Sequence, residues 1–133
     1  MSFDIFVNCF RHREPAPLPR QTVEAIFAPY IVGREDIDIL VVFEDGSRAR
    51  VTIFERSGYG SLAVNRPPAS PAFWQAIIEV LAATDSVLHW PGTGCVITNP
   101  AVADHLPDDM LAALGEPTVT NTVEEVLDCI SRG

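Results

Sequence analysis

The residues best suited to chemistry lie close together, where His89 and Cys95 flank a tight turn and His105 follows ten residues later. A cysteine is a nucleophile only as a thiolate, and a nearby imidazole can hold it in that form. Two strands joined by a tight turn would bring His89 and Cys95 close enough. The sequence shows neither an oxyanion-hole motif nor a third orienting group, and free cysteines are commonly buried as small apolar side chains. Cys95, His89 and His105 are therefore the catalytic candidates of an alternative hypothesis, and we expect Cys95 in the core.

Motifs for metal or phosphate binding are missing from this stretch. His89, His105 and either Asp104 or Asp109 could supply ligands, but no HxH, HExxH or CxxC spacing fixes two of them on one element. Gly92-Thr93-Gly94 lacks the further glycines and the lysine of a phosphate-binding loop. We expect no metal and no cofactor.

The charges divide the chain into two unequal halves. All nine basic residues are arginine, and eighteen acids give a net charge of −9. Residues 1–66 hold eight arginines and nine acids, for a net charge of −1, whereas residues 67–133 hold one arginine and nine acids, for a net charge of −8. Such a surface repels nucleic-acid backbones and anionic membranes. It favours a basic protein partner, although acids also simply keep a protein in solution.

Two features predict a cytoplasmic protein. The first four residues lack the basic region and the long apolar run of a signal peptide, and the longest stretch without Asp, Glu or Arg, 86–103, carries two prolines and two glycines. The three cysteines, Cys9, Cys95 and Cys129, are odd in number and widely spaced, as is typical of reduced thiols.

A hairpin is the clearest local signal. Residues 37–43 and 47–54 have strand patterns, and Asp45-Gly46 between them predicts a type I′ turn. This register places Leu40 opposite Val51, and the apolar run Ile39–Phe43 indicates a strand covered on both faces. We expect its charged side chains to form solvated cross-strand ion pairs rather than an acid–base centre. These residues are Asp36, Asp38, Glu44, Asp45, Glu55, Arg48, Arg50 and Arg56.

The remaining patterns predict a single α+β domain over 1–133, with a mainly antiparallel sheet and three to four helices packed on it. A proline-rich loop separates the first strand from the first helix, and Thr122 and Glu125 match a capping box. The predicted strands are 3–10, 61–64, 87–90, 95–97 and 118–120, with a turn at Gly58-Tyr59-Gly60. The predicted helices begin at Arg20, Pro71, Pro107 and Val123.

Candidate contact residues follow from aromatic side chains beside turns and from the acidic half. Tyr59 between two glycines, Arg66 and Trp90 are residue types enriched in protein interfaces. The predicted acidic surface comprises Asp108, Asp109, Glu116, Glu124, Glu125 and Asp128. Pairing of an exposed sheet edge in a homodimer is a further possibility.

His89-Trp90-Pro91-Gly92, the opening stretch 4–10 and the stretch 105–115 resemble a group of small uncharacterised proteins from high-GC bacteria. In size, acidity and mixed α/β order the chain is also similar to immunity proteins of bacterial toxin systems. The charge of −8 in residues 67–133 and the missing catalytic motif predict a non-enzymatic cytoplasmic module that binds a basic protein. The second resemblance implies that this module is of the immunity or inhibitor type.

Overall fold

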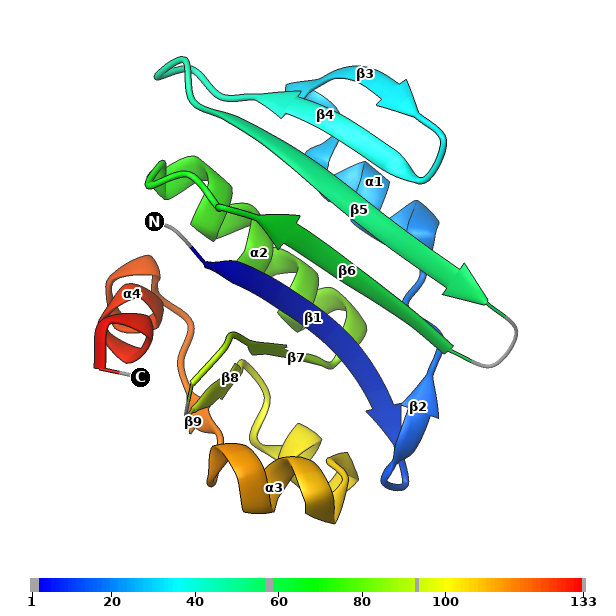
Figure 1. Ribbon diagram of the computed structural model, residues 1–133, viewed down its shortest axis with the longest axis vertical. Helices are drawn as coiled ribbons and strands as arrows, with labels where there is room; N and C mark the ends of the chain where they lie inside the picture. Colours follow the sequence, from blue (N-terminus) through cyan, green and yellow to red (C-terminus); the bar gives the residue numbers. More distant parts are fainter. Residues whose placement is uncertain (1–2, 57–58, 93, 133) are drawn as a thin grey trace.

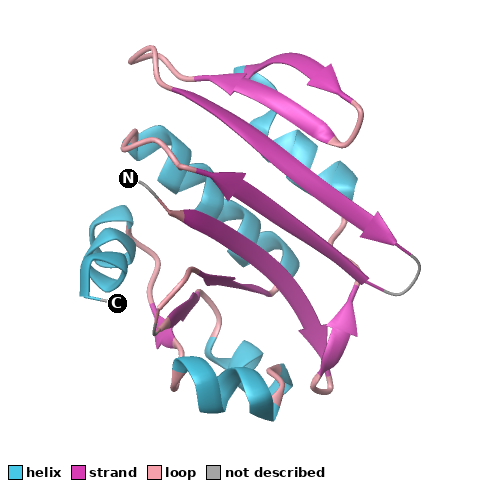
Figure 2. Cartoon of the chain, in the orientation of Figure 1, coloured by secondary structure: helices cyan, strands magenta, loops and turns pink. Residues whose placement is uncertain are grey.

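A computed structural model describes residues 3–56, 59–92 and 94–132, which form one α+β domain (Figures 1 and 2). The described strands make a single sheet with the order β3-β4-β5-β6-β1-β7-β8-β9, and β2 pairs with β1. The strands are β1 (Asp4–Arg11), β2 (Glu14–Ala16), β3 (Ile31–Glu35), β4 (Asp38–Val42), β5 (Arg48–Arg56), β6 (Tyr59–Asn65), β7 (Ser86–His89), β8 (Cys95–Ile97) and β9 (Thr118–Val119).

The sheet is antiparallel except that β9 runs parallel to β8. The expected fold class is confirmed, but the helices are more numerous than expected, since two 3₁₀ segments accompany four α-helices in the described residues. They are α1 (Arg20–Phe27), η1 (Ala28–Tyr30), α2 (Pro71–Thr84), η2 (Pro100–His105), α3 (Asp108–Leu114) and α4 (Val123–Arg132).

Most helices pack on one face of the sheet. Side chains of α1, α2 and α4 join those of the central strands in the main core, with Phe27, Phe73 and Trp74 fully buried. A smaller core lies on the opposite face at the β7–β8 end, where Val87, Cys95 and Ile97 meet η2 and partly buried side chains of α3. In Figure 1, α1 and α2 lie behind the long strands, whereas α3 lies beside the short ones.

Local sequence explains where the helices begin and end. Pro71 opens α2 as its first residue, and Asp85 closes the helix in the left-handed conformation, with φ of 50°. Ser70 occupies the N-cap position, and its side chain makes no capping hydrogen bond within the described chain. Half of the predicted capping box of α4 is present, because the hydroxyl of Thr122 accepts a hydrogen bond from the Glu125 amide (3.2 Å). The Glu125 carboxylate accepts from that hydroxyl (3.0 Å) rather than from the Thr122 amide, which donates to the hydroxyl of Thr120 (3.4 Å).

The predicted register of the β4–β5 hairpin is wrong by one residue. Leu40 pairs with Arg50 rather than Val51. Phe43 and Ser47 close the hairpin with a 2.9 Å hydrogen bond, so three residues form the loop instead of two. Gly46 alone in this loop has a positive φ, 85°, which is the left-handed position of a three-residue loop. A type I′ turn would need positive φ at Asp45 as well.

The observed register buries a different set of β4 side chains from the predicted register. Ile39, Val41 and Phe43 face the core, whereas Leu40 and Val42 lie half-buried on the other face. No helix of the described chain covers that other face along β3, β4 and β5 (Figure 2). The prediction that this strand is covered on both faces is therefore wrong. A one-residue shift exchanges the two faces of a strand, and the observed register buries three large apolar side chains instead of two.

Two strands were not expected from the sequence. Residues 14–16 lie in the predicted proline-rich loop, yet they pair with β1 as β2. Pro15 is tolerated there because proline in a sheet is confined to edge strands. Residues 31–35 form the edge strand β3, which contains a register irregularity between Ile31 and Gly33. The predicted turn at Gly58-Tyr59-Gly60 lies partly outside the described residues, and Tyr59 and Gly60 belong to β6.

Candidate functional site

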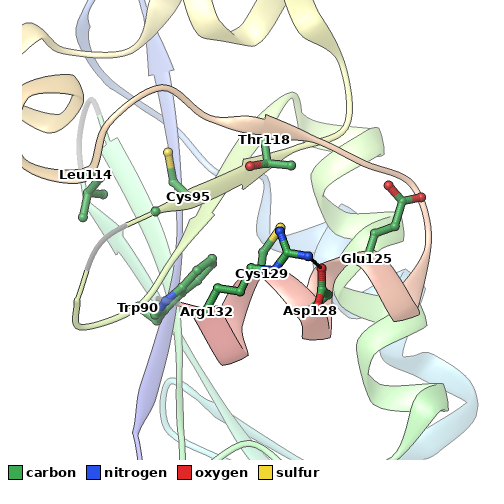
Figure 3. Close-up of a pocket in the computed structure, with 9 residues that line it drawn as sticks. Trp90, Cys95, Leu114, Thr118, Glu125, Asp128, Cys129 and Arg132 are labelled. Atoms are coloured by element: carbon green, nitrogen blue, oxygen red, sulfur yellow. Dashed lines mark ion pairs between the residues drawn. The ribbon is translucent and has the colours of Figure 1, made fainter.

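A cleft of about 440 Å³ opens where β8, β9 and the ends of α3 and α4 meet (Figure 3). One part of its wall is apolar or weakly polar and comes from Trp90, Leu114 and two cysteines. The other part is polar and comes from α4 and β9. The lining residues are Trp90, Gly94, Cys95, Leu114, Thr118, Glu125, Asp128, Cys129 and Arg132. We call this site the α4 cleft.

The chain places these residues together through two local features. Antiparallel pairing of His89 with Cys95 brings the residues after β7 beside β8. The amide of Gly94 donates to the carbonyl oxygen of Leu114 (2.9 Å), which ties the end of α3 to the start of β8. On α4, side chains three or four residues apart share one face, so Glu125, Asp128 and Arg132 all reach the cleft.

Trp90 is not the exposed anchor predicted from the sequence. Its side chain is 4 % exposed and belongs to the main core. Its indole N–H is buried without an acceptor among the described residues, which costs about 1–3 kcal/mol relative to a satisfied donor. The ring lies against Gly94, where an added Cβ would come within 3.4 Å of it. Trp90 therefore acts as a wall of the α4 cleft.

The environment of Cys95 disfavours a nucleophilic role. The side chain is 1 % exposed, and burial raises the pKa of its thiol from about 9 to about 11. The thiol is therefore protonated at neutral pH, which removes the thiolate that nucleophilic catalysis needs. The expectation that Cys95 is a core residue is confirmed, because it packs with Val87, Ile97 and Leu106.

His89 lies on the strand next to Cys95 but is directed to another partner. Its Nε2–H donates to the side-chain oxygen of Asn8 (2.7 Å), and its ring stacks on Phe6 at 5.4 Å between centroids. Burial lowers the pKa of His89, so the imidazole is neutral at pH 7. The structure places the pair on adjacent strands, as predicted, without a hydrogen bond between them in the described chain.

His105, the third catalytic candidate, contacts the β1–β2 turn instead. Its Nδ1 accepts a hydrogen bond from the backbone amide of His12 (3.0 Å), and the two rings meet edge-on at 5.3 Å. The amide of Arg13 donates to the carbonyl oxygen of His105 (2.9 Å). These bonds fix η2 to the N-terminal hairpin.

The predicted acidic residues are all exposed, but they divide into two kinds. Asp108 pairs with Arg13, Asp128 pairs with Arg132 at 2.8 Å, and Glu125 bonds to Thr122. The other three make no ion pair or hydrogen bond through their side chains within the described residues. These unpaired acids are Asp109, Glu116 and Glu124.

The remaining predicted contact residues lie elsewhere. Arg66 is exposed after β6, with a left-handed φ of 52°. Tyr59 begins β6, and its backbone pairs with that of Arg56. The side chain of Tyr59 lies outside the described part of the chain, and Arg66 does not line the α4 cleft. The structure therefore brings Glu125 and Asp128 of α4 together with Trp90 and leaves Arg66 elsewhere.

Of the expected cross-strand ion pairs of the β4–β5 hairpin, the described residues form that of Arg50 with Asp38, and Arg50 also reaches Glu35 on β3. Arg50 contacts Asp38 at 2.8 Å and Glu35 at 3.0 Å. The hydrogen bond from Arg50 lowers the pKa of Asp38, so both charges persist at neutral pH. Paired, ionised side chains at a surface are ordinary ion pairs rather than an acid–base couple.

The described residues contain neither a metal-binding cluster nor a membrane-spanning helix. No group of three or more His, Cys, Asp or Glu side chains there is arranged to hold a metal ion. None of the helices described is both long and apolar enough to cross a membrane.

Comparison with protein-family models, with curated proteins and with solved structures finds no match.

The sequence pointed to part of the α4 cleft only. It predicts Trp90 as an interface aromatic, Cys95 as a thiol beside a tight turn, and Glu125 and Asp128 as members of one acidic surface. Leu114, Thr118, Cys129 and Arg132 were not predicted, since their proximity depends on how β9 and α4 return to β8. The strand pattern at 118–119 was the available signal, because it returns the chain to the sheet beside β8.

Proposed function

We propose that this protein is a non-enzymatic interaction module of the immunity or inhibitor type, which acts in the cytoplasm and binds a basic protein. The binding surface is the acidic exterior of α3, α4 and their connection. This surface comprises Asp108, Asp109, Glu116, Glu124, Glu125 and Asp128. We call it the C-terminal acidic surface.

One observation carries this proposal. All six acids are exposed, and three of them have no partner within the described chain. Of the other three, Asp108 pairs with Arg13 and Asp128 with Arg132, whereas Glu125 bonds to the uncharged side chain of Thr122. Most of the negative potential of this region is therefore left uncompensated, and such a potential steers and orients an oppositely charged protein.

The alternative, an enzyme built on Cys95, His89 and His105, receives little support. The pKa of Cys95 is raised, His89 bonds to Asn8, and His105 bonds to His12. A nucleophile, its base and an orienting group need a shared geometry that these bonds do not provide.

Charge reversal tests the acidic surface. The test variant carries Asp109→Lys, Glu116→Lys and Glu124→Lys, which removes no ion pair of the described chain. We expect it to bind an arginine-rich peptide roughly tenfold more weakly at low salt, with a flatter salt dependence, as measured by calorimetric titration.

A matched control changes the net charge equally at other places. Glu44→Lys, Glu55→Lys and Glu79→Lys alter three exposed acids on the hairpin, β5 and α2. Their combination should weaken binding much less than the test variant does. Equal losses in the two variants would show that overall charge, and not the C-terminal acidic surface, binds the peptide. A neutral peptide of equal length gives the background.

A further inference from the structure

The α4 cleft combines features that suit one long basic side chain. Its volume of about 440 Å³ falls within the range of small-ligand sites. Trp90 and Leu114 supply apolar wall, and Glu125 and Asp128 supply two carboxylates from one helix face. An aliphatic stem with a cationic end needs both kinds of surface.

The chain itself shows that the cleft accepts a guanidinium group. Arg132 comes from the last turn of α4, lines the cleft and places Nη2 2.8 Å from a carboxylate oxygen of Asp128 (Figure 3). It is the one arginine among residues 67–133. A cation of the protein's own thus lies where an arginine of a partner would find its acceptors.

This internal ion pair is easily exchanged. The side chains of Arg132 and Asp128 are 77 % and 54 % exposed. Ion pairs at such exposure contribute little to stability, because water competes for both charges. A second cation could therefore share or replace the contact without disturbing the core, which α4 enters through Val126 and Ile130.

The chemistry of the walls favours arginine over lysine. A guanidinium is planar, stacks on aromatic rings and binds a carboxylate through two parallel hydrogen bonds. An ammonium is a compact, strongly hydrated charge that gains less from an aromatic wall. Because Trp90 is only 4 % exposed, the distinction rests on the two parallel hydrogen bonds that a guanidinium can make to the carboxylate of Asp128 or Glu125.

From these observations we infer that the α4 cleft is the specific contact of the C-terminal acidic surface, where it receives an arginine side chain of the basic partner. This inference rests on the proposed function, since it names the residue type that the surface recognises. Arg132 lines the unbound cleft and competes with the incoming arginine for Asp128.

The test uses arginine amide as the probe and the indole N–H resonances of the two tryptophans as the readout. Trp90 lines the cleft, whereas Trp74 donates to the carbonyl oxygen of Pro68 and lies outside it. We expect arginine amide to shift the Trp90 signal saturably and to leave Trp74 unchanged. Citrulline amide, which has a side chain of similar shape without the charge, should shift neither, and lysine amide should bind more weakly. The signals are assigned by Trp90→Phe.

Two single substitutions provide a charge-matched comparison. Arg132→Ala and Arg13→Ala each remove one positive charge and free one aspartate of the acidic surface. Only the first changes the cleft. Arg132→Ala should tighten binding of arginine amide about two- to fivefold, the strength of an exposed ion pair, while Arg13→Ala leaves it unchanged. Glu125→Gln with Asp128→Asn should abolish the Trp90 shift.

Each failure has a different meaning. A silent Trp90 signal, equal effects of the two arginine substitutions, or equal binding of lysine amide would overturn the inference. If the arginine-rich peptide still bound in that case, and still depended on Asp109, Glu116 and Glu124, the proposed function would stand without the cleft. If instead arginine amide shifted Trp90 but the peptide did not bind, the cleft would be a small-molecule site and the proposed function would fall.

Discussion

At the scale of single residues, burial decides what Cys95 and His89 can do. Both were chosen for their chemical groups, and their proximity on neighbouring strands was predictable from the tight turn between them. Their protonation states were not, because they depend on burial in the folded chain. For Cys95 that burial comes from η2 and α3, which pack on this face from later in the chain. A neutral histidine and a protonated thiol are typical of core side chains.

Cys95 should therefore react slowly. We expect alkylation of Cys95 in the folded protein to be much slower than that of Cys129 at pH 8, because a pKa of about 11 leaves little thiolate and the side chain is buried. Mass spectrometry of labelled peptides measures both rates. Rapid labelling of Cys95 in the native state would contradict this, and the unfolded chain provides the reference.

The raised pKa of Cys95 also makes the stability of the protein depend on pH. Between about pH 9 and 11 the unfolded chain loses the Cys95 proton while the folded chain retains it, so the free energy of unfolding should fall as the pH rises through this range. The raised pKa of Cys9 acts in the same direction. Denaturant unfolding of Cys95→Ala should show a smaller alkaline loss than the unmodified protein. An equal loss would assign the effect to other groups.

At the scale of elements, the hairpin shows where local sequence stops being sufficient. The Asp45-Gly46 signal correctly located the reversal of the chain, and Gly46 is the residue with left-handed φ. The same dipeptide serves two-residue and three-residue loops, however, and the choice between them was made by burial. Ile39 and Val41 reach the core only in the three-residue form. The apolar periodicity of α1 and α2 indicates the buried face of each helix without such an ambiguity.

The close approach of β6 to the chain before α1 can be tested by substitution of a glycine. A Cβ added at Gly60 would lie 2.8 Å from the backbone nitrogen of Leu18, whereas one at Gly33 would meet only ordinary contacts with Leu40. We expect Gly60→Ala to lower the free energy of unfolding by about 1–3 kcal/mol. Gly33→Ala should leave it unchanged or raise it by up to about 1 kcal/mol. Denaturant unfolding compares them, and equal effects would contradict the close approach.

At the scale of the whole molecule, charge is unevenly distributed over the fold. The net charge of −8 in residues 67–133 was predictable from the sequence alone, but the ion pair of Asp108 with Arg13 was not. That contact joins residues 95 positions apart and depends on η2 docking against the β1–β2 turn. Placement of the unpaired acids likewise required the path of the chain between α3 and α4.

Self-repulsion of this charge should be measurable. We expect the unfolding temperature to rise with sodium chloride, because screening relieves repulsion among the acids. In the variant with Asp109, Glu116 and Glu124 changed to lysine, the unfolding temperature should rise less with salt. Each reversal adds two positive charges, so the three together bring the net charge from −9 to −3. Thermal unfolding by circular dichroism measures both. A larger gain in the variant would contradict this account.

The position of β1 has a consequence for the order of folding. This strand lies inside the sheet, with β6 on one side and β7 on the other. The short strand β2, which pairs with residues 9–11 of β1, is made soon afterwards, whereas β6 and β7 follow much later. On the ribosome, the hydrogen bonds of β1 therefore stay incomplete until residue 89 has emerged. Sheets built from such distant pairings fold slowly. During synthesis the apolar face of β1 therefore stays unprotected for most of translation, and chaperones have their longest opportunity to bind there.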